Sequence, residues 1–286
     1  MVIVGAGFAG LAAARELERA GKSVGVFEAR DRVGGRILNR PIGGGEIVEI
    51  GGQWVGPTQD RVLDLIDDLG LEIFRTYAEG QNVYYRSGAR STYTGTIPPA
   101  NPAALAELAL VIEQLNGMAN QVPLHDPAAA ANAQEWDGQS FESWKRANIQ
   151  TDEARDLVDL GIEAVFATEP AEVSLLFVLF YIHAAGNFNR LIDTANGAQE
   201  SRVVGGSQRI ALEMAKDLGR SVRLSQPVIA IDRGGGGVVV HTEKASWKAK
   251  DVIVAIPPPL ISRIAFDPPL PPNRAQLLQR VPQGSV

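Results

Sequence analysis

The residues best suited to chemistry stand near the start of the chain, where three glycines follow a short run of β-branched residues. Residues 2–4 run into Gly5, Gly7 and Gly10, and helix-forming residues follow from Leu11. This order predicts a strand, a tight turn and a helix. In such a turn the first glycine permits the bend, the second lets a pyrophosphate approach the backbone, and the third lets the helix pack close to the strand. Unpaired N–H groups and a partial positive charge at the helix N-terminus would then bind phosphate.

A carboxylate follows these glycines at the spacing of a dinucleotide site. Gly21 ends the predicted helix, and a second predicted strand over residues 23–27 leads to Glu28. In dinucleotide-binding folds an acidic residue about 20 positions after the glycines holds ribose hydroxyls. The alternative is an ordinary strand-helix-strand turn with an incidental glutamate, and the combined context favours the dinucleotide site.

Two arginines and a glycine pair come directly after Glu28, in the stretch A-R-D-R-V-G-G-R. Arg30 and Arg36 could reach phosphates, because guanidinium groups bind phosphate oxygens bidentately, and the glycine pair lets backbone approach a flat or charged ligand. A solvated charged loop is the alternative. A second glycine pair, Gly51 and Gly52, is another point where backbone could lie against a cofactor.

Composition excludes several classes of function. The 286 residues are 45% hydrophobic and 21% charged, which is ordinary for a soluble globular protein of about two domains. The 27 basic and 33 acidic residues give a net charge of −6 without a long basic run, so nucleic acids and membranes are poor partners. Because the chain has no cysteine and its three histidines lack ligand spacing, we expect no metal site.

Apolar patterns predict the remaining elements and a location. Helices are expected over residues 59–69, after Asn101, from residue 152, over 174–184 and over 208–218, and a hairpin is expected around 234–237. The helix over 174–184 is apolar all round and should be buried. The longest apolar run, 173–185, is too short to span a bilayer, and no signal peptide precedes the first strand, so we expect a cytoplasmic protein.

Three stretches in combination resemble the flavin-containing amine oxidases, with monoamine oxidases and bacterial putrescine oxidases nearest. These stretches are V-I-V-G-A-G-F-A-G, E-A-R-D-R-V-G-G-R and G-G-Q-W-V-G-P-T-Q. The resemblance implies FAD as the cofactor, with Glu28 on the adenosine ribose and the backbone of Val228 at the adenine. It implies that the pyrophosphate is flanked by Ala9, Arg30 and Arg36. The predicted cofactor-binding residues are therefore Gly5, Gly7, Ala9, Gly10, Glu28, Arg30, Gly35, Arg36, Gly51, Gly52, Gln53, Trp54 and Val228, of which Gly51–Trp54 would run beside the flavin.

The resemblance extends to the N-G-A-Q-E-S-R-V-V-G-G run at 196–206 and implies a substrate cavity. Its lining would include Gly161, Ala164, Val165, Ile192 and Gln199. From the residues alone, ordinary core or loop positions are the simpler interpretation. Gly161 and Ala164 are small where relatives often carry larger apolar side chains, which suggests a roomier pocket.

The resemblance also implies an α/β fold divided into two domains. A Rossmann-type FAD-binding domain would comprise residues 1–74 and 203–278, and an inserted, mainly helical substrate-binding domain would comprise 75–202 and 279–286. Relatives continue past the G-S-V at 284–286 to a lysine that holds water at the flavin and to an aromatic pair that sandwiches the amine. We therefore expect the front part of a larger enzyme, truncated at the C-terminus, whose catalytic residues lie beyond Val286. A short flavoprotein that functions without these parts is the alternative.

The implied activity is FAD-dependent oxidation of a primary amine or polyamine to an imine and then an aldehyde, with release of ammonia and hydrogen peroxide. The small-molecule partners would be the amine and oxygen, and a homodimer is left open. Alternatives are an amino-acid oxidase or a desaturase of the same superfamily, and a non-catalytic FAD-binding module. An NAD-linked dehydrogenase is disfavoured because nicotinamide cofactors do not need the R-V-G-G-R loop.

Overall fold

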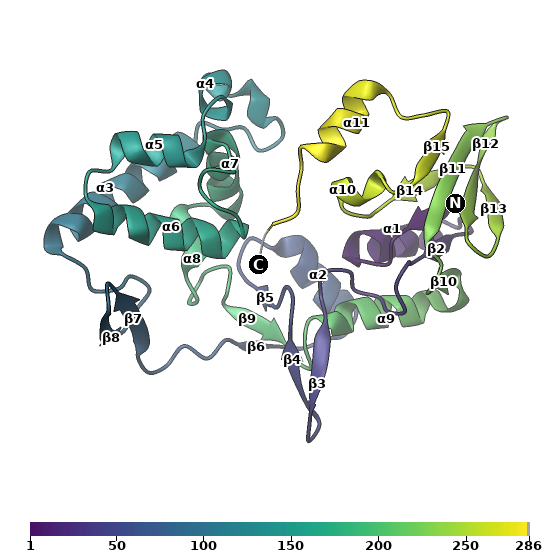
Figure 1. The fold of residues 1–286 in the computed structure, drawn as a ribbon. Helices are drawn as coiled ribbons and strands as arrows, with labels where there is room; N and C mark the ends of the chain where they lie inside the picture. Colours follow the sequence, from purple (N-terminus) through teal and green to yellow (C-terminus); the bar gives the residue numbers. More distant parts are fainter. Residues whose placement is uncertain (285–286) are drawn as a thin grey trace. The chain divides into compact units, whose positions relative to one another are not determined.

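The computed structural model describes residues 1–284, which form two compact units (Figure 1). Unit 1 comprises Met1–Gln53, Asp64–Phe74 and Arg202–Gln283, and unit 2 comprises Trp54–Leu63, Arg75–Ser201 and Gly284. The predicted domain ranges differ from these units at residues 54–63, because Gly56 packs so closely on Gly197 of unit 2 that a Cβ atom at Gly56 would lie 2.1 Å from the Gly197 carbonyl oxygen. They also differ at Arg202 and at residues 279–283, which belong to unit 1. The assignment of cofactor and substrate roles to the two units stays a prediction.

A parallel sheet of four strands, ordered β10–β2–β1–β14, is the basis of unit 1. Its strands are Val222–Arg223 (β10), Gly25–Phe27 (β2), Val2–Val4 (β1) and Val252–Val254 (β14). Helix α1, Phe8–Arg19, connects β1 to β2, as the glycine pattern predicts. Because Val2 pairs with Gly25 on one side and with Val252 on the other, the strands end together at one edge of the sheet.

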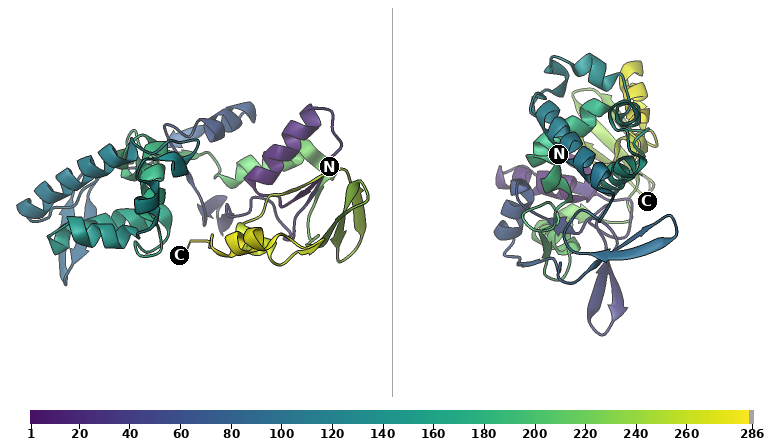
Figure 2. Two further views of the ribbon diagram at one scale, coloured as in Figure 1. Left: turned by 90° about the horizontal axis from the view of Figure 1, so that it is seen from above. Right: turned by 90° about the vertical axis from the view of Figure 1, so that its left-hand side faces the viewer.

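Helix α9, Gln208–Leu218, packs beside α1 over this sheet (Figure 2, left). Arg15 of α1 joins three helices, since its guanidinium lies 3.0 Å from Asp68 at the end of α2 (Asp60–Asp68) and 3.2 Å from Asp217 of α9. The Arg15 side chain is only 11% exposed. These ion pairs hold the helix that begins at the glycine turn.

A second sheet in unit 1 packs face to face with the parallel sheet. Its order is β13–β12–β11–β15, and β11 and β12 form the predicted hairpin through the turn at 235–236. Ile231 and Val240 from this sheet form one apolar core with Val2, Val4 and Phe27 of the parallel sheet. Its strands are Ser246–Ala249 (β13), Gly237–Thr242 (β12), Val228–Gly234 (β11) and Ala265–Asp267 (β15).

Short elements complete unit 1 and the crossings between the units. Unit 1 also contains the hairpin of β3 (Asn39–Gly43) and β4 (Glu46–Glu49), the 3-10 turn η2 (Gly219–Ser221), and helices α10 (Pro258–Ile261) and α11 (Pro272–Gln279). Helix α2 and strands β6 (Ile73–Arg75) and β9 (Ser201–Val203) lie where the chain passes from one unit to the other.

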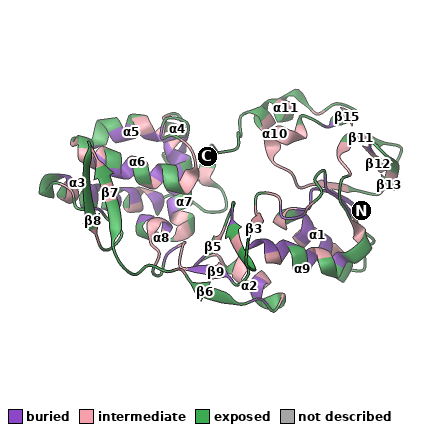
Figure 3. Cartoon of the chain, turned by 60° about the horizontal axis from the view of Figure 1, so that its bottom comes forward, coloured by how far each residue is buried: buried purple, intermediate pink, exposed green. Residues whose placement is uncertain are grey.

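Unit 2 is mainly helical, and its buried residues lie along the inner faces of its helices (Figure 3). Asn101 caps α3, because its side-chain oxygen accepts a hydrogen bond of 2.8 Å from the Ala103 amide. Leu115, Ile162 and Leu179 are almost fully buried where α3, α6 and α7 meet. The elements of unit 2 are β5 (Trp54–Val55), the hairpin of β7 (Asn82–Arg86) and β8 (Ala89–Tyr93), α3 (Pro102–Ala119), η1 (Pro127–Ala129), α4 (Ala133–Asp137), α5 (Phe141–Asn148), α6 (Asp152–Phe166), α7 (Leu175–Ala185) and α8 (Phe188–Ile192). No helix within residues 1–284 is both long enough and apolar enough to cross a membrane.

Helix α7 only partly fulfils the expectation that an apolar helix is buried on every side. Leu175, Leu179 and Ile182 are fully buried, whereas Phe177 is 47% exposed and Tyr181 is 40% exposed. The ring of Phe166, at the end of α6, lies 6.0 Å from the Phe177 ring and 5.0 Å from the Tyr181 ring. In the described residues, aromatic stacking replaces full burial on this face of the helix.

The beginning of α6 is fixed by a carboxylate from α3. Glu107 accepts hydrogen bonds from the Gln150 amide at 2.5 Å, the Thr151 amide at 2.9 Å and the Thr151 hydroxyl at 2.6 Å. The backbone bond from Gln150 and the hydroxyl of Thr151 lower the pKa of Glu107. Thr151 therefore occupies the N-cap position just before α6 but gives its hydroxyl to Glu107 rather than capping α6 itself.

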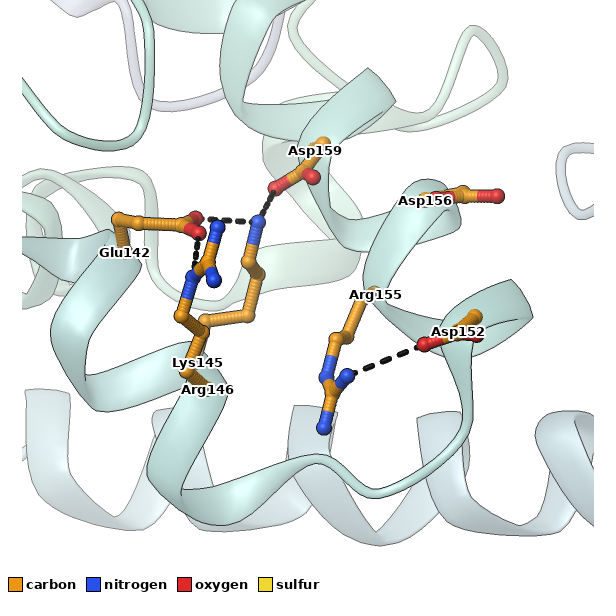
Figure 4. A pocket seen from close by; sticks show the side chains of 7 residues that line it. All are labelled: Glu142, Lys145, Arg146, Asp152, Arg155, Asp156 and Asp159. Carbon is orange, nitrogen blue, oxygen red and sulfur yellow. Dashed lines mark hydrogen bonds and ion pairs between the residues drawn. The ribbon is translucent and has the colours of Figure 1, made fainter.

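A hollow of about 300 Å³ between α5 and α6 is lined entirely by charged side chains (Figure 4). Lys145, only 5% exposed, lies between Glu142 and Asp159, with its ammonium nitrogen 2.5 Å from Glu142. Burial alone would lower the pKa of Lys145, but hydrogen bonds to Asp159 and Glu142 outweigh burial and raise it. Three basic and four acidic side chains line the hollow, and the fourth acid, Asp156, pairs with Arg86 outside it, so we interpret the hollow as a structural ion-pair network.

We predict that replacing Lys145 with methionine destabilises unit 2 by about 2 kcal/mol, because two partly buried carboxylates lose their shared cation. Arg146→Met is the matched control: Arg146 pairs with the same Glu142, yet its side chain is 75% exposed, so the loss should be much smaller. Amide hydrogen exchange in α5 and α6 measures the free energy of local unfolding in each variant. Equal losses in the two variants would contradict a special role for the buried lysine.

The contribution of this network should also depend on pH in a defined direction. Hydrogen bonds from Lys145 and Arg146 lower the pKa of Glu142 below 4.5, so its stabilisation is present above that pH and lost as the pH falls through the lowered value. The raised pKa of Lys145 keeps its stabilisation intact below pH 10.5, and it is lost as the pH rises further. The difference in the free energy of unfolding between wild type and Lys145→Met should be constant between these two pH limits and shrink outside them.

Candidate cofactor-binding site

The glycine turn after β1 has a shape that side chains would prevent. Gly5 has a φ of +104°, and a Cβ atom there would lie 2.8 Å from the Ala255 carbonyl oxygen. A Cβ atom at Gly10 would lie 1.9 Å from the carbonyl oxygen of Gly5, so α1 lies directly on the turn. The Gly5 amide donates to the Phe27 carbonyl at 2.8 Å, which fixes the turn at the end of β2. Glycine is therefore required at both positions by the fold itself.

The N-terminus of α1 is open to an anion. Gly7 is its capping residue and has extended backbone; no side chain caps the helix and its first turn has no acidic residue. Ala9, in this first turn, is exposed. Backbone N–H groups at such an end lack partners within the helix and carry partial positive charge. The geometry provides a place for a pyrophosphate without a lysine.

Glu28 is a buried carboxylate, 8% exposed, that follows β2 and joins two segments of the site. One oxygen accepts a hydrogen bond of 2.8 Å from the Ala6 amide, and the other accepts one of 3.0 Å from the Arg30 amide. An ionised carboxylate can accept about four hydrogen bonds, so Glu28 keeps capacity for two ribose hydroxyls. It also shapes the turn that would bind phosphate, a role that the sequence did not reveal.

The arginine loop lies against the glycine turn. A Cβ atom placed on Gly35 would lie 3.4 Å from the Gly7 Cα atom, so the two glycines lie side by side. Arg30 donates to the Gly35 carbonyl at 3.0 Å, and Arg36 is exposed. Arg32, which sequence reasoning did not single out, also donates to the Gly35 carbonyl at 3.0 Å. Arg32 stands in the sequence between Arg30 and Arg36, the two candidates for phosphate binding, and nothing in that position indicated that it would hold the loop.

The second glycine pair lies on the backbone of the arginine loop. A Cβ atom at Gly51 would lie 2.3 Å from the Arg36 carbonyl oxygen, and the Gly52 amide donates to that oxygen at 3.4 Å. The carbonyl of Gln53, the next residue, accepts from the Ser207 hydroxyl at 3.1 Å. Gly7, Gly35, Gly51 and Gly52 therefore belong to one continuous surface of unit 1.

Two predicted cofactor residues lie apart from that surface along the chain. Val228 begins β11, and the strand is tied to the site because the Gln226 amide donates to the Glu28 carbonyl at 2.8 Å. Trp54 belongs to unit 2, where it is 45% exposed. The structure thus gathers the predicted residues of unit 1 and leaves Trp54 with the other unit.

The predicted substrate residues all lie in unit 2. A Cβ atom at Gly161 of α6 would be 3.4 Å from Phe188 and 3.9 Å from Ile192, so α6 and α8 meet there. Ala164 is exposed and Val165 is half-buried on α6. Gln199 donates to the Leu191 carbonyl at 2.9 Å, and its side-chain oxygen is buried without a hydrogen-bond partner in the described chain. Their role in substrate binding stays a prediction.

The sequence model of the flavin containing amine oxidoreductases matches residues 8–286. The chain belongs to this family. Over its full length it is 44% identical to the protein AofH of Mycobacterium tuberculosis, 39% identical to putrescine oxidase of Kocuria rosea and 38% identical to human flavin-containing amine oxidase B. It spans 63%, 62% and 55% of these proteins, respectively.

Solved structures of the family confirm the predicted fold class. A putrescine oxidase bound to putrescine superposes with a TM-score of 0.92 at 40% identity, covering 97% of this chain and 62% of the oxidase. Cyclohexylamine oxidase from Brevibacterium oxydans superposes with a TM-score of 0.90 at 30% identity, with the same coverages. Both likenesses are close enough in sequence to support the family as well as the fold.

FAD is the cofactor of this family, and the residues of unit 1 fit it. The open N-terminus of α1 suits the pyrophosphate, and the spare acceptor capacity of Glu28 suits the ribose. Among residues 1–284, apart from its chain neighbours and its own helix, the Gly35 Cα atom alone lies within 4 Å of a Cβ atom placed on Gly7, at 3.9 Å, so no side chain crowds this point of the turn. The predicted contacts of individual residues with FAD stay predictions.

We predict that Glu28→Ala weakens FAD binding by roughly a hundredfold or more, because each charge-assisted hydrogen bond contributes about 1.5–3 kcal/mol. Glu28→Gln should lose less, since its amide oxygen can still accept from the Ala6 amide. Titration of apoprotein with FAD, followed by fluorescence, measures both. Glu213→Gln is the control, because the partly buried carboxylate of Glu213 pairs with Arg209 and Lys216 of its own helix. Wild-type affinity in Glu28→Ala would refute the ribose assignment.

Proposed function

We propose that the whole protein to which this chain belongs oxidises a small primary amine or polyamine with FAD. The amine carbon loses two electrons and two protons leave, giving an imine that water hydrolyses to an aldehyde and ammonia. Oxygen accepts the two electrons and two protons and becomes hydrogen peroxide. The observation that carries the proposal is the buried carboxylate of Glu28 on the glycine turn where α1 begins, in a chain of the amine oxidoreductase family.

The residues of unit 1 would bind and orient the dinucleotide. The N-terminus of α1 would hold the pyrophosphate, Glu28 the ribose, and Arg30 and Arg36 the phosphate charge. When bound, FAD supplies the two-electron oxidant for the amine carbon and returns the electrons to oxygen. The backbone of Gly51–Gln53 would lie beside its flat ring.

The residues of unit 2 support an amine as the substrate. The buried oxygen of Gln199 has no partner among residues 1–284 and can accept a hydrogen bond from an amine nitrogen. Gly161 lets α6 pack against Phe188 and Ile192 of α8, and the exposed Ala164 adds little bulk one turn further along α6. The relatives named for putrescine and cyclohexylamine suggest an aliphatic amine, and they leave its length and shape open.

We predict that the whole protein carries a yellow flavin that putrescine or an arylalkylamine bleaches without oxygen. With oxygen, the same amine should yield ammonia and hydrogen peroxide in equal amounts. Absence of the chromophore, or a flavin that no amine in a panel of mono-, di- and polyamines reduces, would contradict the proposal. Bleaching by amino acids alone, or formation of a new carbon–carbon double bond, would favour the amino-acid oxidase or desaturase alternatives.

We also predict that residues 1–286 alone release peroxide far more slowly than the whole protein. The resemblance places the water-holding lysine and the aromatic pair beyond Val286, and misplacement of about 1 Å costs roughly a hundredfold in rate. Peroxide release with putrescine, compared at equal FAD occupancy, is the measurement. Equal rates would show that the 286 residues suffice for catalysis.

A further inference from the structure

The first turn of α9 holds the arginine loop from outside the glycine turn. Gln208, only 7% exposed, donates through its side-chain amide to the Val33 carbonyl at 3.0 Å, and its side-chain oxygen accepts from the Asn39 amide at 2.8 Å. The Gln208 side chain therefore forms a hydrogen bond with each end of the loop at residues 33–39. A Cβ atom at Gly34 would lie 3.3 Å from the Gln208 side chain, so the loop also packs against it.

A buried carboxylate holds the second glycine segment to the same turn. Glu49, at the end of β4, has a side chain only 2% exposed, and one oxygen lies 2.6 Å from the Arg202 guanidinium. Its other oxygen accepts a hydrogen bond of 2.6 Å from the Ser207 amide. The Ser207 hydroxyl donates to the Gln53 carbonyl, so the segment at 50–53 is anchored at both of its ends.

The two long helices of unit 1 that begin near the site use their N-termini differently. The N-terminus of α9 already has an anion, because Glu49 accepts from the Ser207 amide and pairs with Arg202. The partial positive charge at the N-terminus of α9 is thus paired with a carboxylate of the protein itself, whereas Gly7, the capping residue of α1, has no side chain to cap its helix. This contrast assigns the ligand phosphate to α1 and a structural role to α9.

We propose that Gln208 and Glu49 are positioning residues for the dinucleotide. Gln208 sets the loop at 33–39, and Glu49, with Arg202 and Ser207, sets the segment at 50–53. Neither side chain has to touch the cofactor, because each acts through backbone that would. The inference rests on the proposed binding of FAD to unit 1.

The test compares Gln208→Leu and Glu49→Gln in the whole protein. Each variant keeps the approximate side-chain volume. Gln208→Leu removes both bonds to the loop at 33–39, whereas Glu49→Gln removes the negative charge and leaves one oxygen to serve both Arg202 and the Ser207 amide. We expect FAD affinity, measured by titration of apoprotein, to fall about tenfold in each. In the apoprotein, amide exchange should accelerate over residues 33–39 in Gln208→Leu and over 50–53 in Glu49→Gln. The visible absorbance bands of the bound flavin should shift in Glu49→Gln.

Ile210→Val on the same helix is the matched control. Ile210 is 1% exposed, so the variant weakens packing of α9 without changing a bond to either loop. Its affinity for FAD and its exchange over both loops should equal those of wild type. If Gln208→Leu does not fold, Asn39→Ala replaces it in the test. Asn39→Ala removes the hydrogen bond of 2.8 Å from the Asn39 side chain to the Gly205 carbonyl, which loosens the same end of the loop. We then expect about threefold weaker FAD binding.

The outcomes separate this inference from the proposed function. A wild-type protein that binds no FAD would refute the proposed function, while loop exchange in the apoprotein would still test the anchoring. Variants that unfold at lower temperature yet bind FAD with wild-type affinity would overturn the positioning role. Loss of affinity in Ile210→Val equal to that in Gln208→Leu would overturn it too, because general destabilisation would then explain both.

Discussion

The candidate site depends on a single buried carboxylate. Glu28 joins the glycine turn to the arginine loop through the Ala6 and Arg30 amides, at the edge where the parallel strands end. The Gly34 amide makes a further link between these two segments, because it donates to the Ala6 carbonyl at 2.9 Å. Because burial makes an unpaired carboxylate costly, the carboxylate enforces the loop geometry that satisfies it.

Around this bridge the protein separates the structural anion from the place for a ligand anion. Glu49 fills the N-terminus of α9, and the N-terminus of α1 stays open. The glycines complete the site by letting backbone segments pack closely, since Gly35 lies beside Gly7 and Gly51 lies on the backbone of Arg36. A flat, charged ligand can then be bound largely by backbone, which is insensitive to most side-chain changes.

The strand, turn and helix at the start of the chain could be predicted because local chemistry determines them: β-branched residues, three glycines and Glu28 stand within 28 positions. The anchoring by Gln208 could not be, because its partners Val33 and Asn39 lie 175 and 169 positions away. Thr151 shows a similar limit, since its hydroxyl serves Glu107 of another helix. The full burial expected of α7 was wrong for Phe177 and Tyr181, because hydrophobicity does not reveal which neighbours a helix finds.

The strand order of the parallel sheet also has a consequence for folding during synthesis. β1 pairs with β2 only about 20 residues later, yet its other neighbour, β14, is about 250 residues away. One edge of β1 therefore has no native partner until about 250 further residues have been synthesised, whereas the helices of unit 2 lie between the two strands in the sequence and can form in the meantime. An unpaired apolar strand edge invites association between nascent chains. Slow translation or a shortage of chaperones should thus affect unit 1 before unit 2.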